Sequence, residues 1–292
     1  MKLIVVTGGS GFIGSNLIEL LLKKTNYKII SLDNYSTGST KNHIKNPNVK
    51  YLRGDTENIS KHLSSYRKNI VAIFHFAEFS RIAQSFEKIN LCFKSNILGT
   101  LETVNFCLSN KIKIIYSATS ASLGNMGDDQ NLSPYAFTKA NNMNLIINYN
   151  KWFKLRYEIV YFYNVYGPRQ IKNSFMSAVI GVFENCYEKN IPLPVVKPGT
   201  QTRKFTHVQD TVEACFYAWK RNKNEHYSIS TRRSYTIMQV AKFFGKKIKY
   251  IKQRRGERFE SSVVQKIRSL KINNLYGKID LKDYIFNYKK SI

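Results

Sequence analysis

The sequence predicts an α/β protein: a Rossmann-type, doubly wound parallel sheet with a smaller C-terminal lobe. Two observations support this fold class. Short apolar runs alternate with amphipathic stretches as far as residue 165, which is typical of strands and helices in βαβ units. A glycine-rich loop joins the first apolar run to the first amphipathic stretch. With 292 residues, 43% of them hydrophobic, the chain can form one large domain or a main domain with a smaller lobe.

Strands and helices are expected in alternation before the pattern weakens. The strands cover residues 2–7, 28–33, 49–54, 70–76, 112–117 and 157–163, and the helices cover residues 12–24, 56–66, 84–110 and 135–152. Beyond residue 170 the elements become shorter, and prolines interrupt the chain at positions 192, 194 and 198. We therefore expect residues 1–165 to form the Rossmann domain. Residues 166–292 should form mainly a substrate-binding lobe, with some segments returning to the Rossmann domain.

The cysteines, histidines and apolar runs argue against several classes of protein. The longest apolar run, residues 70–77, is far shorter than the roughly 20 residues that span a bilayer, and the N-terminus shows no signal-peptide cleavage pattern. The five histidines show no metal-ligand spacing, so no metal site is expected. The cysteines form no CxxC pair and are typical of reduced thiols: Cys92, Cys107, Cys186 and Cys215. We expect a cytoplasmic protein without a membrane span.

The net charge of +27 allows three interpretations. The first is a general surface bias, because lysines are spread along the whole chain and Asn, Ile and Tyr are also abundant. The charge could also provide a positive field that favours capture of a phosphate-bearing ligand. Binding to nucleic acid or to a membrane surface is the third interpretation, and the absence of a basic stripe in the sequence argues against it.

The loop "VVTGGSGFIGSNL" has the form of a dinucleotide-binding turn. Gly8, Gly11 and Gly14 follow the first strand and open the first helix, so backbone N–H groups and the helix N-terminus can meet a pyrophosphate. Asp33 ends the second strand, 33 − 14 = 19 residues past Gly14, close to the spacing of a ribose-binding acid. Its carboxylate favours NAD over NADP, although a structural turn with an unrelated Asp is the alternative. Asp55 could receive the adenine amino group or cap a helix.

Tyr135 and Lys139 stand four residues apart in "SPYAFTKANN", at the start of a predicted helix. Both side chains therefore project from one helix face. Such a pair alone is more often a half-buried Tyr and a solvated Lys. Beside a dinucleotide site, however, the ammonium and an oxidised nicotinamide would favour the phenolate, making Tyr135 a general base. Thr119 ends the fifth strand 135 − 119 = 16 residues earlier and could bind the same substrate oxygen.

A series of motifs in this order resembles one family over nearly the whole chain. The motifs are "TGGSGFIGSNL", "LDNYSTGS", "GD", "HFA", "NILGT", "SPYAFTK", "NVYGPRQ", "GTQTRKFTHVQD" and "RRGE". They are similar to those of the extended short-chain dehydrogenase/reductases, and within them to the NAD-dependent nucleotide-sugar epimerases and dehydratases, most of all the UDP-glucose 4-epimerases. This resemblance implies a Rossmann fold, NAD as cofactor and a nucleotide-diphosphate sugar, UDP-linked, as substrate.

The resemblance also implies roles for individual residues. Tyr135 would be the base, Lys139 the ribose-binding activator and Thr119 the partner of the substrate hydroxyl. The cofactor-binding positions would be Gly8, Gly11, Phe12, Ile13, Gly14, Asp33, Asn34, Asp55, Ala77, Asn96, Tyr135 and Lys139. The substrate-binding positions would be Thr119, Asn164, Arg203, Arg254 and Glu257. For the two arginines a solvated surface position is the alternative in so basic a chain.

The region after the motif His75 departs from the family pattern. The family usually has a Lys five residues after this His, where Ser80 stands here, with Arg81 beside it. Glu78 replaces a residue that is usually small. These changes flank the reacting sugar, so they bear on the substrate more than on the fold.

The function expected from these residues is a UDP-sugar 4-epimerase. A 4,6-dehydratase or a 4-keto-sugar reductase are the enzymatic alternatives, and an NAD-binding scaffold without turnover is the alternative from another class. Similar dehydratases carry an Asp–Glu pair directly after the strand-end Thr, where this chain has Ser120 and Ala121. The amphipathic helices at 84–110 and 135–152 suggest a homodimer, because relatives pair through equivalent helices.

Overall fold

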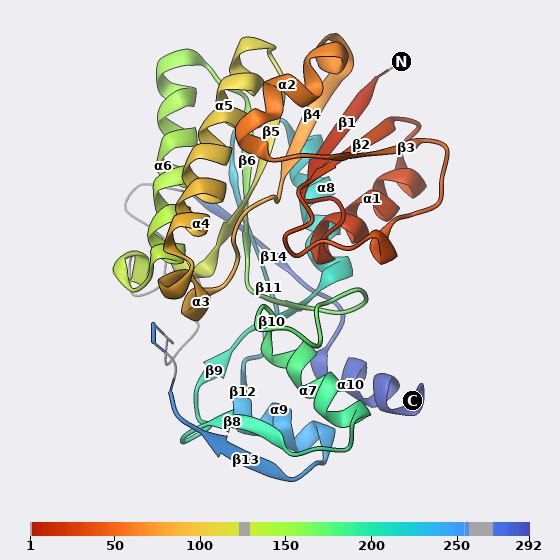
Figure 1. Cartoon of the computed structure of the whole chain (residues 1–292), viewed down its shortest axis with the longest axis vertical. Helices are drawn as coiled ribbons and strands as arrows, with labels where there is room; N and C mark the ends of the chain where they lie inside the picture. The colour runs from red at the N-terminus through yellow and green to blue at the C-terminus, as the bar shows by residue number, and fades with distance from the viewer. Residues whose placement is uncertain (1, 123–128, 254, 257–270) are drawn as a thin grey trace.

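Eight parallel strands form the central sheet of the computed structural model, which describes residues 2–122, 129–253, 255–256 and 271–292 (Figure 1). The strand order is β14-β11-β6-β5-β4-β1-β2-β3. The order 3-2-1-4-5-6 within it is that of a doubly wound sheet, which reverses between β1 and β4. The predicted fold class is confirmed. The strands are β1 (Leu3–Thr7), β2 (Lys28–Asp33), β3 (Val49–Arg53), β4 (Ile70–His75), β5 (Lys113–Thr119), β6 (Tyr157–Phe162), β11 (His226–Ser230) and β14 (Ile272–Tyr276).

Helices cover both faces of the sheet, because its inner strands carry apolar side chains on both sides (Figure 1). These helices are α1 (Phe12–Lys24), α2 (Ile59–Leu63), α5 (Gly99–Ser109), α6 (Pro134–Phe153) and α8 (Val208–Arg221). α1 and α8 pack on one face, where Leu17 and Val212 are fully buried. α2, α5 and α6 pack on the other face around Val104 and Ile146. The two apolar layers hold the carboxyl ends of the strands in fixed positions.

The single helix predicted over residues 84–110 is instead a series of shorter pieces. They are α3 (Ile82–Glu87), α4 (Ile89–Phe93), a π-helical segment (Lys94–Leu98) and α5. Lys88, between α3 and α4, has non-helical backbone angles of φ −112° and ψ 40°. The π-helical segment turns Asn96 into the interior. The helix predicted over residues 56–66 is likewise shorter, since α2 is flanked by 3₁₀ turns.

A smaller group of elements lies below the carboxyl ends of the strands in Figure 1. Its core is formed by apolar side chains from α7, α9, α10 and β8, including the fully buried Phe183 and Phe244. Short two-stranded sheets β7–β10, β9–β12 and β8–β13 complete it. These elements are α7 (Val179–Glu188), α9 (Ile237–Phe244), α10 (Leu281–Lys290), β7 (Asn164–Tyr166), β8 (Leu193–Val196), β9 (Thr202–Arg203), β10 (Phe205–His207), β12 (Tyr235–Thr236) and β13 (Ile248–Ile251).

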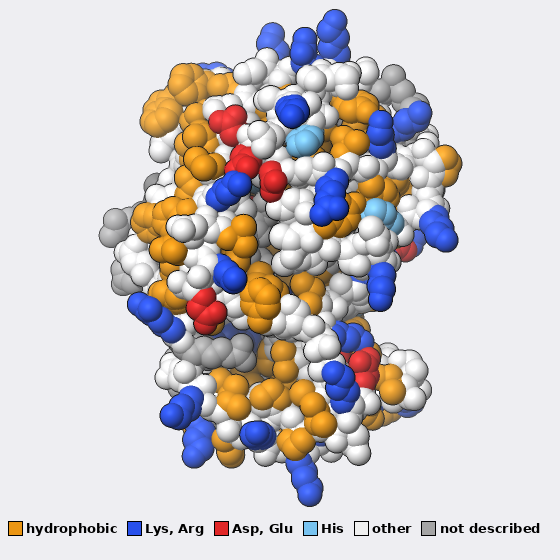
Figure 2. All heavy atoms as spheres, in the orientation of Figure 1, with side chains coloured by type: hydrophobic (Ala, Val, Ile, Leu, Met, Phe, Trp, Pro, Cys, Tyr) orange, Lys and Arg blue, Asp and Glu red, His pale blue; other side chains and the backbone are white. Residues whose placement is uncertain are grey.

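Basic side chains are scattered over the surface on the side shown in Figure 2. They lie on both the upper body and the lower lobe and form no stripe on this face. Among the described residues, no helix is long and apolar enough to cross a membrane.

Candidate active site

A cavity of about 630 Å³ lies at the carboxyl ends of the strands, between the sheet and the smaller lobe. Its walls include residues that directly follow β1, β2, β4 and β5, together with Pro194, Val196 and Ile237 from the lobe. Doubly wound folds bind ligands at this edge, where the strand order reverses. Its volume suits a small-molecule ligand or cofactor.

The glycine loop forms one wall of this cavity and fits a pyrophosphate. Gly8 has φ +72°, and a Cβ there would stand only 2.9 Å from the carbonyl carbon of Phe76. A Cβ on Gly14 would collide with the carbonyl oxygen of Gly8, so the helix can start close to the strand only because Gly14 has no side chain. Gly11 caps α1 without a side-chain hydrogen bond, so Phe12 and Ile13 offer backbone N–H groups toward the cavity.

Asp33 ends β2 at the cavity wall and fits a ribose. Its Oδ2 accepts a hydrogen bond from the Ser10 backbone N–H at 2.9 Å, and its Oδ1 accepts one from the Tyr35 N–H at 2.8 Å. Burial raises the pKa of Asp33, and these hydrogen bonds oppose that rise. Each oxygen keeps a further lone pair, so the carboxylate can accept hydroxyl donors while repelling a phosphate.

Asn34 and Asp55 lie together beside Asp33. The Asn34 side-chain amide donates to Asp55 Oδ1 at 2.7 Å, and both residues line the cavity. Asp55 precedes a 3₁₀ turn, but its side chain makes no capping hydrogen bond there. The helix-cap alternative for Asp55 therefore finds no support in its side-chain contacts.

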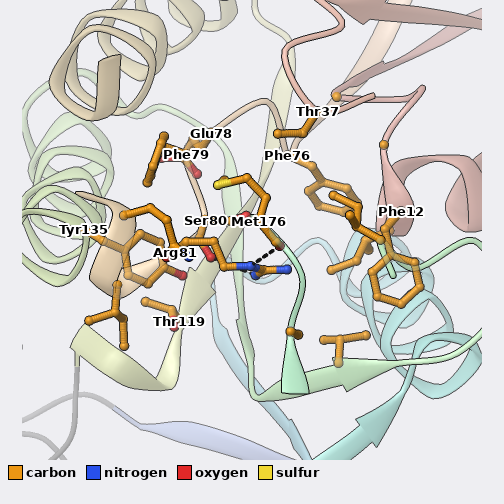
Figure 3. A pocket seen from close by; sticks show the side chains of 18 of the residues that line it. Phe12, Thr37, Phe76, Glu78, Phe79, Ser80, Arg81, Thr119, Tyr135 and Met176 are labelled. Carbon is orange, nitrogen blue, oxygen red and sulfur yellow. Dashed lines mark hydrogen bonds between the residues drawn. The ribbon is translucent and has the colours of Figure 1, made fainter. Parts of the chain in front are cut away.

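Tyr135 and Lys139 are positioned by the first turns of α6. The Ser133 hydroxyl caps the helix by accepting from the Ala136 N–H at 3.1 Å. Both side chains line the cavity, and the two residues are only 9% and 4% exposed, which removes the interpretation of Lys139 as a solvated surface residue. Thr119, at the end of β5, lines the same cavity (Figure 3).

Lys139 is held from several sides. Its Nζ forms an ion pair with Glu78 and donates to the Ser117 carbonyl oxygen at 2.5 Å. The same nitrogen stands 4.8 Å from the centre of the Tyr116 ring. Glu78, which the sequence marks only as a departure from the family pattern, is thus a direct partner of Lys139. The signal that could have found it is a carboxylate three residues after a buried strand, because burying a carboxylate is costly without a partner.

His75, the motif histidine before Glu78, is neutral and structural. Burial lowers its pKa to about 4. Its Nδ1 and Nε2 each lie 2.9 Å from a hydroxyl, that of Thr7 on β1 and that of Thr100 on α5. His75 therefore links the sheet to the helix layer and is not exposed to the cavity.

Arg81 extends into the cavity from the segment after β4. Figure 3 shows it reaching from beside Tyr135 toward the side of Phe12. Its Nε donates to the Met176 carbonyl oxygen at 2.5 Å, and its guanidinium also donates to the Ser80 carbonyl oxygen at 2.9 Å. Burial lowers the pKa of Arg81. A cation is thus present at position 81, next to position 80, where the family pattern has a Lys and this chain has Ser80.

The remaining predicted positions fall into three groups. Ala77, Asn164 and Arg203 line the cavity. Asn96 does not: it is fully buried, its Oδ1 accepts from the Phe79 N–H at 2.6 Å, and its amide donates to Thr138 Oγ1 at 3.0 Å. Asn96 therefore supports the cavity wall from behind. The direct contact with the cofactor that the resemblance implies is not the position that the structure gives it. Arg254 and Glu257 lie outside the described residues. Among the described residues, no group of His, Cys, Asp and Glu could hold a metal ion.

Known proteins share both sequence and fold with this chain. The family model described as "NAD dependent epimerase/dehydratase family" matches residues 4–230. A relative from Methanocaldococcus jannaschii, provisionally named a UDP-glucose 4-epimerase, is 30% identical over 97% of this chain and 96% of its own. A dTDP-D-glucose 4,6-dehydratase from Dictyostelium discoideum is 30% identical, over 82% of this chain and 60% of its own. The solved structure of a UDP-glucose 4-epimerase with UDP-glucose from Thermotoga maritima has a TM-score of 0.87 over 99% of both chains, at 24% identity.

Proposed function

The chain belongs to the NAD-dependent epimerase/dehydratase family, with NAD as cofactor, and we propose that it is a 4-epimerase of a UDP-sugar. One observation carries the proposal: Tyr135, Lys139 and Thr119 line the same cavity as the glycine loop and Asp33. A base, a cation and a hydroxyl around one cavity are the groups that oxidation of an alcohol requires.

The roles follow from the chemistry of each side chain. When bound, NAD supplies a hydride acceptor that also returns the hydride. The Tyr135 phenolate oxygen takes the proton of the sugar C4 hydroxyl and gives it back when the alcohol is re-formed. The Thr119 hydroxyl hydrogen-bonds the same substrate oxygen and orients it. Lys139 holds the cofactor ribose. Epimerisation follows if the 4-keto sugar presents its other face before reduction.

The nucleotide-diphosphate part of the substrate would lie toward the smaller lobe. Asn164 and Arg203 line the cavity from that side, and a guanidinium suits a diphosphate because its N–H donors match pairs of phosphate oxygens. Arg254 and Glu257 complete this proposed set. The relative from M. jannaschii, which covers this chain almost completely and is named for UDP-glucose, supports a UDP-linked sugar.

A 4,6-dehydratase is the competing activity, since the family includes such enzymes. It must remove the C5 proton and protonate the departing C6 hydroxyl, which needs acid–base groups next to Thr119. Ser120 and Ala121 follow Thr119 and are not carboxylic acids. Glu78 is the nearby carboxylate that could replace them, but it is already bound to Lys139 and to three other donors. The residues of this chain therefore support epimerisation.

NMR of nucleotide sugars incubated with the purified protein in deuterated water tests the proposal. We expect 4-epimers of a UDP-sugar without deuterium at C5, because only the C4 hydride moves. Deuterium at C5 of a 4-keto-6-deoxy product would contradict it and indicate a dehydratase. Tyr135→Phe is the matched control, since it removes the base and keeps the ring.

We also propose that the protein forms a homodimer in the cytoplasm. Large apolar side chains are exposed on α4 and α6, namely Ile89, Leu91, Phe93, Phe137, Trp152 and Phe153. Large apolar side chains exposed on two helices are typical of a helix-to-helix subunit contact. All four cysteines are free and buried, in keeping with a reducing compartment.

A further inference from the structure

Glu78 is a buried carboxylate at the wall of the cofactor cavity. Its side chain is only 2% exposed, yet the residue lines the cavity. Oε2 forms the ion pair with Lys139. Oε1 accepts from the Tyr116 hydroxyl at 3.0 Å, the Asn142 amide at 2.9 Å and the Thr100 hydroxyl at 3.2 Å. Both oxygens of this buried carboxylate are therefore satisfied by donors.

This carboxylate fixes the position of the Lys139 ammonium. An ammonium has three N–H donors, and two are used by Glu78 and by the Ser117 carbonyl oxygen. The Ser117 hydroxyl lies 3.5 Å away and competes only weakly for the third. One donor is therefore left for a ligand in the cavity, in an orientation that Glu78 and Ser117 determine.

The same ion pair offsets part of the positive charge that Lys139 brings to the cavity. The other titratable groups packed around Glu78 do not replace it, because His75 is neutral and burial raises the pKa of Tyr116 well above its ordinary value. Arg81 supplies a second cation, beside Tyr135. Without Glu78, Lys139 and Arg81 would both repel a positively charged ring.

We propose that Glu78 is a positioning residue that orients Lys139 and makes the cavity prefer the cationic nicotinamide of NAD⁺ over the neutral ring of NADH. The inference rests on the proposed function, because an epimerase restores its cofactor in each cycle and must rest in the oxidised form. Glu78 thus biases the resting enzyme toward the state that can begin turnover.

The test is the ratio of the dissociation constants of NAD⁺ and NADH, measured by fluorescence on purified protein stripped of nucleotide. Glu78→Gln keeps the size of the side chain and removes its charge. We expect NAD⁺ binding to weaken about tenfold relative to NADH binding, because one charge acts at close range in a cavity of intermediate dielectric. If Glu78→Gln weakens the binding of NAD⁺ and of NADH by the same factor, the proposal is overturned and Glu78 has a purely structural role.

Two further variants separate charge from folding. Glu158→Gln changes an equally buried pair, Lys113–Glu158 at 2.9 Å, which does not line the cavity, and it should leave the ratio unchanged. The double variant Glu78→Gln/Lys139→Met removes both charges, so its ratio should return toward that of the parent protein. If the double variant keeps the ratio of Glu78→Gln, the charge argument is wrong.

This experiment does not require sugar turnover. If no nucleotide sugar is converted but the ratio changes as expected, the proposed activity fails and the role of Glu78 stands. If 4-epimers form while the ratio is unaffected, the role of Glu78 fails alone.

Discussion

Two buried histidines should make the protein less stable as the solution is acidified. Burial lowers the pKa of His75 and of His226 to about 4, from an ordinary value of 6.5. His226, on β11, is almost fully buried, and its Nδ1 lies 2.7 Å from the Tyr161 hydroxyl. Within the part of the chain that the structure describes, neither ring has a carboxylate at hydrogen-bond distance, although the charge of Glu78 partly opposes the lowering of the pKa of His75.

The sign and size of the effect follow from proton linkage. The unfolded chain protonates each imidazole near pH 6.5, whereas the folded chain does so only near pH 4. Stability is therefore fully present above the unfolded value and is lost as the pH falls through this window. Each pH unit costs at most about 1.4 kcal/mol per histidine, so two units cost at most about 5.6 kcal/mol for the pair. Burial also raises the pKa of Glu184, and its protonation offsets part of this loss.

Urea unfolding at a series of pH values measures this loss. His226→Gln cannot titrate but can still hydrogen-bond Tyr161, and position 226 does not line the cavity. Between about pH 6.5 and about pH 4.5 the variant should lose about 2 kcal/mol less unfolding free energy than the parent protein, which is the share of one histidine. The two proteins should show the same pH dependence above about pH 7.5, which serves as the internal control. An equal loss in both proteins at acid pH would refute the assignment of His226 as a buried neutral group.

Other predictions concern the cofactor, the base and the assembly. Asp33→Ala should weaken NAD binding by about tenfold or more, because hydrogen bonds to a charged group are lost. The same change should also relax discrimination against NADP. Tighter binding of NADP than of NAD by the parent protein would contradict the role of Asp33. Tyr135→Phe should lower turnover by about 10²–10⁴-fold while NAD stays bound, and activity within a few-fold of the parent would mean that another group is the base. Light scattering at micromolar concentration should give twice the chain mass of 33.9 kDa, and Trp152→Glu, at a side chain 63% exposed on α6, should shift it toward the monomer. A monomer mass for the parent protein would rule out the dimer.

The parts of the fold that local sequence determines were predictable. β1, the glycine loop and α1 follow one another within 22 residues, and Asp33 falls at the end of the next strand. Their signals are an apolar run, a loop that needs glycine at particular positions and a 3.6-residue period, all of which act over short distances. The pairing of Tyr135 with Lys139 was also predictable from local sequence, because residues one helical turn apart lie on the same face of the helix.

The features that were not predictable depend on contacts between distant segments. The pairing of Glu78 with Lys139 joins residues 61 apart and arises because β4 and β5 are neighbours in the sheet. The π-helical segment exists where Asn96 must reach the backbone of Phe79. β14, "INNLY", has a weak apolar pattern and becomes a strand because it pairs with β11 at the sheet edge.

The chain passes several times between the sheet and the smaller lobe, so the two parts cannot unfold or separate independently. After β6 the chain enters the lobe, returns for α8 and β11, leaves again for α9 and β13, and comes back as β14 before ending in α10 (Figure 1). Proteolytic removal of everything after residue 165 would strip β11 from β6 and expose the backbone of a long apolar strand, a site for aggregation. The two parts should therefore melt in a single cooperative transition, and any opening of the cavity must occur by bending of these connections and not by release of one part from the other.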